Sequence, residues 1–290
     1  MLLHTEHLTK SYNGFRALDD LNLTVTRGEV VGLLGPNGSG KTTALRLILG
    51  FLRPTTGHAT VAGHDCWADS VRARRHVSYL PGELRLYENM TGRQLVRFLG
   101  ELRGDERRAD VDALARRFDI DLDRPIAHLS SGMKRKVALL QVLVPHAPLL
   151  ILDEPTNTLD PTMRDELLAQ LRQARDGGQA VVFSSHVLGE VEQVCDRVAI
   201  LQRGRLVHLQ EMKELRQGRL VHVRFGGAAP APPDLPGLSV REQGDGRATW
   251  EHAGDLPPLL EWLGRQPILE LRIEPLGLSG VYHRYHGAVA

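Results

Sequence analysis

The segment at residues 35–42 reads GPNGSGKT and fits the phosphate-binding pattern G-x-x-x-x-G-K-[ST]. Its glycines let the backbone wrap tightly around phosphate oxygens, and amides at a helix start point at the negative charge. The Lys41 ammonium is suited to the β- and γ-phosphates, and the Thr42 hydroxyl to Mg²⁺. The nucleotide-contacting residues expected from this segment are Gly35, Pro36, Asn37, Gly38, Ser39, Gly40, Lys41, Thr42 and Thr43.

A second candidate is the pair of adjacent carboxylates Asp153 and Glu154, which follows the apolar run at residues 149–152. An apolar run that ends in an acid is typical of a parallel strand whose tip faces a site. Asp153 is suited to hold Mg²⁺, usually through water, and Glu154 to deprotonate an attacking water. The alternative is a solvated strand end without chemistry.

Three further segments carry weaker signals when each is taken alone. The serine- and glycine-rich residues 129–134 predict a capped helix start, with Ser130 as the cap. Residues 156–161 follow the carboxylates directly and contain Asp160. His186 follows an apolar strand-like run, and by itself it would be read as an ordinary loop histidine.

These residues need elements that place them at one edge of a sheet. Residues 29–34 read as a buried strand before the glycine-rich segment, and residues 43–49 as a helix after it. The pattern turns helical from about residue 90 to 117 and continues to 118. Further strands are predicted at about 57–63, 149–153, 180–184 and 197–201, and further helices at 132–144, 165–174 and 187–195. The alternation predicts an α/β core that carries a helical insertion.

The composition changes near Arg216, and a turn-rich connection occupies residues 226–237. Residues 220–225 and 268–273 alternate like strands, and residues 256–263 look helical. A small α+β appendage is therefore expected over residues 212–290. His283 and His286 near its end are read as an exposed helix face rather than a metal site.

The bulk properties exclude several classes of protein. A chain of 290 residues with a net charge of +1 has no general attraction for nucleic acid, although basic patches remain open. The two cysteines, Cys66 and Cys195, have no metal-ligand spacing and are read as buried apolar residues in a reducing compartment. We expect no signal peptide, and no apolar run approaches the roughly 20 residues of a membrane span.

In this order the motifs closely resemble the nucleotide-binding subunit of ATP-binding cassette (ABC) transporters, over roughly residues 2–210. The resemblance implies an α/β, P-loop NTPase core with a helical subdomain at about 84–147, an ATPase domain at 1–211 and a small accessory domain at 212–290. It implies ATP and Mg²⁺ as ligands, with Thr42 and Asp153 toward the metal. It assigns Tyr12 to adenine stacking, residues 129–133 to the signature motif, and Asp160 to the D-loop.

The resemblance also implies catalytic roles for Lys41, Glu154 and His186. His186 stands at the position of the family's switch histidine. Two subunits, identical or closely paralogous, pair head to tail in this family. Ser130, Ser131 and Gly132 of one subunit are then expected to complete the phosphate site of the other.

Three positions depart from the commonest family pattern. The signature reads LSSGM, in which the anion-facing Ser130 and Gly132 are retained, and Asn157 and Thr158 stand in the D-loop where a small pair is usual. Gly82 stands where the family has a glutamine that touches Mg²⁺ and senses the membrane partner. Glu83 or water fills that place, or the metal shell is incomplete.

The YLPGE segment at residues 79–83, together with the tail, resembles a branch of drug-efflux exporters that pair with a separate integral-membrane permease. The expected location is the cytoplasm, peripheral on the inner face of the membrane through that permease, with no nucleic acid as partner. An importer subunit is the first alternative. A soluble ABC protein acting on ribosomes or DNA is the second, which the single phosphate loop disfavours.

Overall fold

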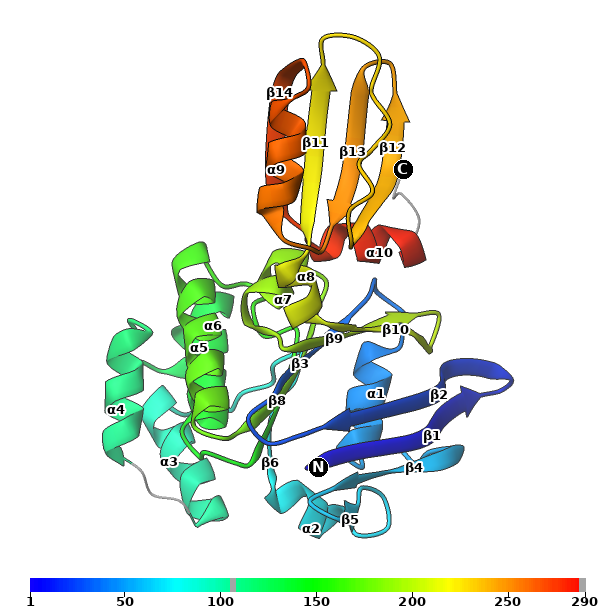
Figure 1. The fold of residues 1–290 in the computed structure, drawn as a ribbon. Helices are drawn as coiled ribbons and strands as arrows, with labels where there is room; N and C mark the ends of the chain where they lie inside the picture. The colour runs from blue at the N-terminus through cyan, green and yellow to red at the C-terminus, as the bar shows by residue number, and fades with distance from the viewer. Residues whose placement is uncertain (105–107, 287–290) are drawn as a thin grey trace. The chain divides into compact units, whose positions relative to one another are not determined.

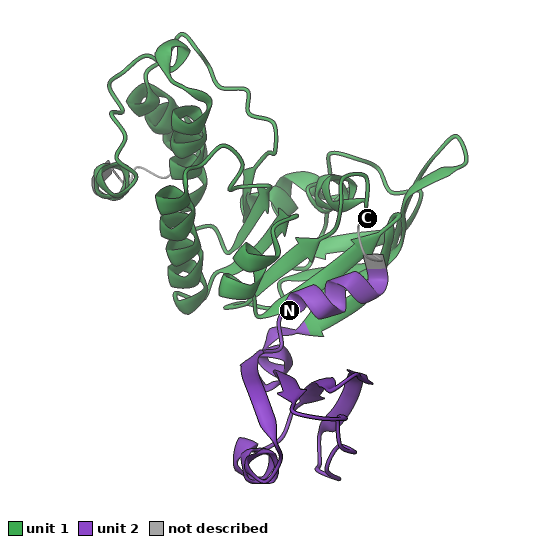
Figure 2. Cartoon of the chain, turned by 90° about the horizontal axis from the view of Figure 1, so that it is seen from above, with its two compact units in different colours: residues 1–210 green, residues 211–290 purple. Residues whose placement is uncertain are grey.

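The computed structural model describes residues 1–104 and 108–286. The chain divides into two compact units, residues 1–210 and 211–290, which are coloured separately in Figure 2. Within the described residues, every helix is too short or too polar to cross a bilayer. Cys66 and Cys195 are both buried, as the sequence predicts, and neither forms a disulfide bond within the described residues.

A six-stranded sheet forms the centre of the first unit, in the order β10-β9-β3-β8-β7-β6 (Figure 1). The strands from β9 to β6 run parallel to their neighbours. Every residue of β3, β7 and β8 is buried, which explains their continuous apolar sequences. The strands are β3 (Val30–Leu34), β6 (Val77–Leu80), β7 (Leu149–Asp153), β8 (Ala180–Ser185), β9 (Arg197–Gln202) and β10 (Arg205–Glu211).

Three helices of the first unit follow buried strands of this sheet, so the chain has the α/β character that the sequence predicts. They are α1 (Lys41–Ile48) after β3, α6 (Pro161–Asp176) after β7 and α7 (Leu188–Val194) after β8. Helix α6 begins earlier than the predicted residue 165. The Asp160 side chain accepts a hydrogen bond from the Met163 N–H, and Pro161 occupies the first turn, where it costs no hydrogen bond.

A second sheet, in the order β2-β1-β4-β5, is antiparallel. It shares one apolar core with α1 and the parallel sheet, in which Leu3, Leu45 and Val182 are fully buried. Its strands are β1 (Leu3–Tyr12), β2 (Phe15–Val25), β4 (Thr56–Val61) and β5 (His64–Asp65), and the short helix α2 (Ser70–Arg75) follows.

The helical insertion contains α3 (Gly92–Arg103), α4 (Arg108–Arg117), the 3₁₀ turn η1 (Ile126–His128) and α5 (Ser131–Leu143). The helical stretch predicted from 90 to 117 is not one helix, because it contains the two helices α3 and α4. Helix α3 begins at a capping box between Thr91 and Gln94 and ends at Gly104, whose φ of 70° closes the helix. Residues 105–107 of that stretch lie outside the described residues.

The second unit is a four-stranded antiparallel sheet, in the order β12-β13-β11-β14, with α9 packed on one face. Trp250, Leu259 and Val221 are fully buried in its core. Its elements are α8 (Met212–Gln217), β11 (Arg219–Phe225), β12 (Leu238–Gly244), β13 (Arg247–His252), α9 (Leu256–Gly264), β14 (Ile268–Pro275) and α10 (Leu278–His286). His283 is exposed on α10.

Candidate functional site

The glycine-rich loop joins the end of β3 to the start of α1. Gly38 and Gly40 have φ values of 78° and 105°, which side chains other than hydrogen disfavour. A Cβ on Gly35 would lie 2.4 Å from the Leu201 carbonyl oxygen and 2.5 Å from Ser39 Oγ. The loop therefore needs glycine for its backbone conformation and for its packing.

The ammonium of Lys41 lies at the mouth of this loop. It donates hydrogen bonds to the carbonyl oxygens of Gly35 at 2.6 Å and Pro36 at 3.2 Å, and lies 3.5 Å from Glu154 Oε1. The Lys41 side chain is only 6% exposed. Helix α1 has no side-chain cap, so the chain's own side chains do not occupy its first amides. The loop can receive phosphate oxygens here.

Oxygen ligands suited to Mg²⁺ lie beside the loop. The Thr42 hydroxyl donates to Asp153 Oδ2 at 3.0 Å, and the Ser184 hydroxyl donates to Asp153 Oδ1 at 2.6 Å. Ser39 Oγ is buried with no hydrogen-bond partner within the described part of the chain. A hydroxyl and a carboxylate in contact are the hard donors that Mg²⁺ prefers, so these residues fit the metal.

Glu154 is placed between Lys41 and His186. Its Oε2 lies 2.7 Å from His186 Nδ1, and its backbone N–H donates to Ser184 Oγ at 2.9 Å. The φ of Glu154 is +48°, a left-handed conformation that non-glycine residues seldom adopt. Ser184 thus holds the Asp153 carboxylate and the Glu154 backbone. The left-handed backbone at Glu154 accompanies a side chain that lies toward Lys41 and His186.

The sequence did not identify Ser184 and Glu190 as site residues. Glu190 Oε2 accepts hydrogen bonds from Thr156 at 2.9 Å and Ser185 at 3.0 Å, and all three residues are buried. Through these hydrogen bonds, Glu190 connects Thr156, just after Glu154, to Ser185, just before His186. A lone acid in the helix after β8 was the only signal in the sequence.

Gly82 lies directly against the carboxylate of Asp153. A Cβ on Gly82 would lie 3.4 Å from Asp153 Oδ2, whereas the neighbouring Glu83 is exposed. The Arg135 guanidinium, 5% exposed, donates to the carbonyl oxygens of Pro81 at 3.1 Å and Gly82 at 2.7 Å. The sequence analysis did not single out Arg135.

Burial lowers the pKa of the Arg135 guanidinium, and the negative charges of Asp153 and Glu154 oppose that shift. Its Nε has no hydrogen-bond partner among residues 1–104 and 108–286. A buried cation with an unused donor therefore lies within the electrostatic reach of both site carboxylates.

The remaining predicted residues do not join the Lys41–Glu154–His186 group. Ser130 caps α5 by accepting a hydrogen bond from the Met133 N–H at 3.3 Å, and both Ser130 and Ser131 are exposed. A Cβ on Gly132 would lie 2.9 Å from the Thr158 carbonyl oxygen. In the described parts of the chain, no hydrogen bond or ion pair links the first turn of α5 to the glycine-rich loop.

Asp160 and Tyr12 are also apart from that group. Asp160 is exposed and caps α6 through the Met163 N–H at 2.9 Å. Tyr12 ends β1, is 45% exposed, and has Lys10 Nζ 4.9 Å from its ring centroid. Its open ring face is available for stacking.

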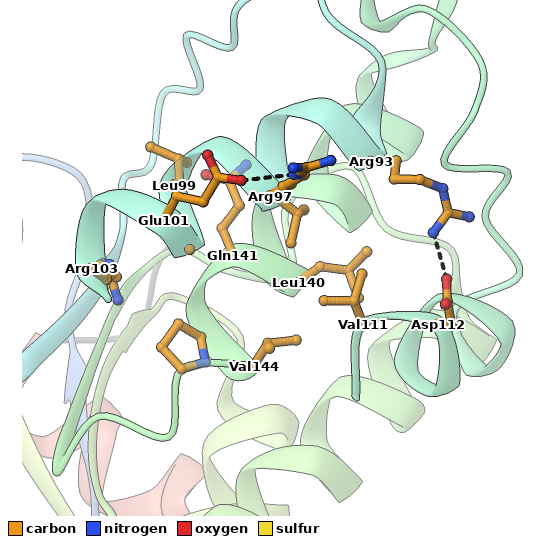
Figure 3. A pocket seen from close by; sticks show the side chains of 13 residues that line it. Arg93, Arg97, Leu99, Glu101, Arg103, Val111, Asp112, Leu140, Gln141 and Val144 are labelled. Atoms are coloured by element: carbon orange, nitrogen blue, oxygen red, sulfur yellow. Dashed lines mark hydrogen bonds and ion pairs between the residues drawn. The ribbon is translucent and has the colours of Figure 1, made fainter. Parts of the chain in front are cut away.

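An apolar cavity of about 180 Å³ lies between α3, α4 and α5, away from this group (Figure 3). Val111, Leu140 and Val144 point into it, and ion pairs from Arg93 to Asp112 and from Arg97 to Glu101 lie at its margin. None of the predicted site residues lines it.

The fold and the loop define a P-loop ATPase of the ABC type. Residues 18–157 match the family model for ABC transporters. Over 244 residues the chain is 38% identical to the daunorubicin resistance ATP-binding protein DrrA3 of Streptomyces coeruleorubidus, covering 80% of this chain and 77% of that protein. The chain therefore belongs to the ATP-binding subunits of the ABC transporter family, and it is an ATPase of that family.

Two other relatives bear on its function. The chain is 33% identical to the ribose import ATP-binding protein RbsA of Hahella chejuensis, over 78% of this chain and 47% of that protein. A solved structure described as the ATP-binding subunit of an ABC transporter superposes with a TM-score of 0.70 at 31% identity, covering 75% of this chain and 92% of the other.

Proposed function

We propose that the chain powers an ABC exporter by binding and hydrolysing ATP. It would work as a homodimer, or with a close paralogue, beneath a separate permease on the inner face of the cell membrane. The observation that carries the proposal is the contact of Lys41, Glu154 and His186 beside the Thr42–Asp153 pair. The resistance protein DrrA3 among the relatives supports export.

In this proposal the phosphate loop and Lys41 hold the nucleotide, while Thr42 and Asp153 hold Mg²⁺. When bound, the metal supplies positive charge that stabilises the transferring phosphoryl group. Glu154 accepts a proton from the attacking water, and His186 orients the Glu154 carboxylate through its Nδ1. Tyr12 stacks on the adenine.

The signature residues Ser130, Ser131 and Gly132 and the D-loop Asp160 would act on the site of the opposing subunit. Ser130, Ser131 and Asp160 are exposed and Gly132 is half-buried. This supports the role, because a surface that completes a neighbour's site must be open in one copy. The first turn of α5 offers amide groups to the phosphate there.

We propose two functional domains, an ATPase domain at residues 1–211 with a helical subdomain at about 84–147, and an accessory domain at 212–290. The compact units at 1–210 and 211–290 support this division. Import is the alternative, since the ribose import protein RbsA is also a relative and the permease decides direction.

Glu154→Gln tests the hydrolytic role. The amide cannot accept the proton, so we expect turnover to fall about 10²–10⁴-fold, with ATP binding retained and an ATP-bound dimer accumulating. Glu192→Gln, an acid on α7, is the control and should keep the parent turnover. Wild-type turnover in Glu154→Gln would remove Glu154 from the role of base.

Purification from gently solubilised native membranes tests the transport role. A polytopic partner that co-purifies and raises ATP turnover is expected. Vesicles carrying that complex then give the direction, because uptake into inside-out vesicles corresponds to export. A fully active chain with no membrane partner would contradict the transporter assignment.

A further inference from the structure

Strand β14 lies at one margin of the sheet in the second unit, beside β11 (Figure 1). It pairs with β11 from Arg219 to Phe225, and within the described residues no other strand pairs with it. An exposed strand edge presents unpaired N–H and C=O groups, and proteins usually protect such edges. Both edge strands have one irregularity in register: β12 between Val240 and Glu242, and β14 at Leu269, where its pairing with β11 shifts. From Glu270 to Pro275, β14 pairs regularly with β11.

The direction of the hydrogen bonds identifies which β14 residues face outward. In β11 the Phe225 N–H donates to the β13 hairpin, whereas the Gly226 N–H donates across to the Pro267 carbonyl oxygen. Even-numbered residues of β11 therefore turn toward β14, where they oppose even-numbered residues. It follows that Leu271 and Ile273 turn their N–H and C=O groups away from β11.

Exposed apolar side chains lie along this unpaired edge of the sheet. Leu269 is 62% exposed and Leu271 is 40% exposed. Glu270 and Arg272 flank Leu271 and are also exposed. Charged side chains on an edge usually oppose pairing with another strand. The central charges of β14 have opposite signs, so they can pair with each other across a two-fold axis.

Consider two copies of β14 paired antiparallel about a two-fold axis at Leu271. This pairing gives the outward backbone groups hydrogen-bond partners and places opposite charges across from each other. Leu271 of one copy then lies opposite Leu271 of the other. Their outward N–H and C=O groups form the two hydrogen bonds of an antiparallel pair. Glu270 of each copy opposes Arg272 of the other. Opposite charges directly across strands are favourable, and like charges are unfavourable.

Other centres fit less well. A pairing centred on Arg272 also lets the outward groups of Leu271 and Ile273 meet, but it opposes two arginines directly across the axis, which is unfavourable. A pairing centred on Ile273 places Pro275, which has no N–H, opposite Leu271. The pairs that Glu270 and Arg272 make within one copy, with Arg224 and Glu274, are solvent-exposed and contribute little.

We infer that the β14 edge is an interface with a second copy of this chain, in which β14 pairs with β14 about a two-fold axis at Leu271. The interface joins two four-stranded sheets into one continuous sheet. It is independent of nucleotide, and so it does not rest on the proposed function.

Charge exchange tests the interface in the full chain without nucleotide. The wild type should dimerise in light-scattering or sedimentation measurements. Glu270→Lys alone and Arg272→Glu alone should each weaken dimerisation about tenfold, because the two-fold axis doubles every like-charge pair. The double variant should return to within about threefold of the wild type, although the pairs within one copy stay disrupted.

The ion pair from Arg265 to Glu261 on α9 supplies matched controls, since its side chains are 73% and 70% exposed. Glu261→Lys and Arg265→Glu should leave dimerisation unchanged. A nucleotide-free chain that stays monomeric would overturn the proposal, as would equal affinities for all the variants.

Cysteine cross-linking tests the register. Leu271→Cys should form a disulfide-linked dimer on mild oxidation, because the paired Cα atoms would lie about 5.5 Å apart. The native Cys66 and Cys195 are buried and should not interfere. Leu260→Cys on α9 is the control, since Leu260 is 43% exposed and Leu271 is 40% exposed. Cross-linking of Ile273→Cys in place of Leu271→Cys would overturn the register.

Discussion

The guanidinium of Arg135 donates a hydrogen bond of 2.7 Å to the carbonyl oxygen of Gly82. Arg135 belongs to α5, the helix whose first turn carries the proposed signature residues, and Gly82 lies against Asp153, the proposed Mg²⁺ ligand. The contact holds the backbone at Gly82, a residue that has no side chain with which to make contacts itself. It also joins α5 to the proposed Mg²⁺ site within one subunit.

Replacement of Arg135 should therefore disturb the metal site. Groups that support metal ligands typically change metal affinity or activity 10–100-fold when they are removed. We expect Arg135→Met to lower turnover by at least about tenfold and to raise the Mg²⁺ concentration for half-maximal activity, with the KM for ATP nearly unchanged. The measurement is steady-state turnover as a function of Mg²⁺ concentration.

Arg135→Lys keeps the charge with fewer hydrogen bonds and should recover part of the loss. Lys134→Met, one residue earlier on α5, is the matched control. If Arg135→Met lowers thermal stability but leaves the Mg²⁺ dependence unchanged, Arg135 serves the fold alone.

Gly82→Gln should restore a ligand to the metal site. The Cβ would point at Asp153 Oδ2 from 3.4 Å, so a side-chain amide has a path toward the metal. We expect the Mg²⁺ requirement or the turnover to change about threefold or more, since a new oxygen donor enters the shell. Gly189→Gln on α7, where a Cβ meets open space, is the control. Unchanged kinetics would mean that the wild-type site has no missing ligand.

Much of the fold could be predicted because its signals are local. The continuous apolar runs of β3, β7 and β8 reflect burial on both faces of a parallel sheet, and their ends hold the phosphate loop and the two carboxylates. The β12–β13 hairpin was missed because β12 is almost entirely exposed and lacks an apolar face. Its turn, Asp245-Gly246 with φ values of 45° and 73°, was a local signal that could have revealed it.

The supporting residues of the site could not be predicted in the same way. Ser184 reaches Asp153 across 31 residues, and Arg135 reaches Gly82 across 53. Such contacts depend on which strands become neighbours, and no spacing in the sequence encodes that. The residues with family motifs were predictable by resemblance, whereas Ser184, Glu190 and Arg135 required the folded sheet.

Ser184→Ala should reduce activity more than stability. The change removes the hydrogen bond to Asp153 and leaves the buried Glu154 N–H without its partner, which costs about 1–3 kcal/mol. We expect turnover to fall about 10–100-fold because the Asp153 carboxylate and the Glu154 backbone both lose a partner. Ser78→Ala is the control, since Ser78 is equally buried and accepts a hydrogen bond from Arg103. Equal kinetic losses in both variants would show a general effect of lost stability.

The Asp19 carboxylate should stabilise the first unit in a pH-dependent way. Asp19 on β2 bonds Arg205 on β10 at 2.8 Å and Arg16 at 2.7 Å. The hydrogen bond from Arg205, followed by that from Arg16, holds the pKa of the Asp19 carboxyl below its ordinary value. Because the folded pKa lies below the unfolded one, the carboxylate stabilises the fold fully above pH of about 4. This contribution is lost as the pH falls through the folded pKa.

Asp19→Asn should therefore unfold at a lower temperature than the wild type at neutral pH, and the difference should shrink below pH of about 4. The measurement is thermal unfolding of both proteins across that range. Asp165→Asn, at an exposed position on α6, is the control and should show no such dependence. Because Arg205 is the main partner, Arg205→Met should give the same loss at neutral pH and little further loss when combined with Asp19→Asn. A difference between wild type and Asp19→Asn that stays constant with pH would contradict the ion pair as its cause.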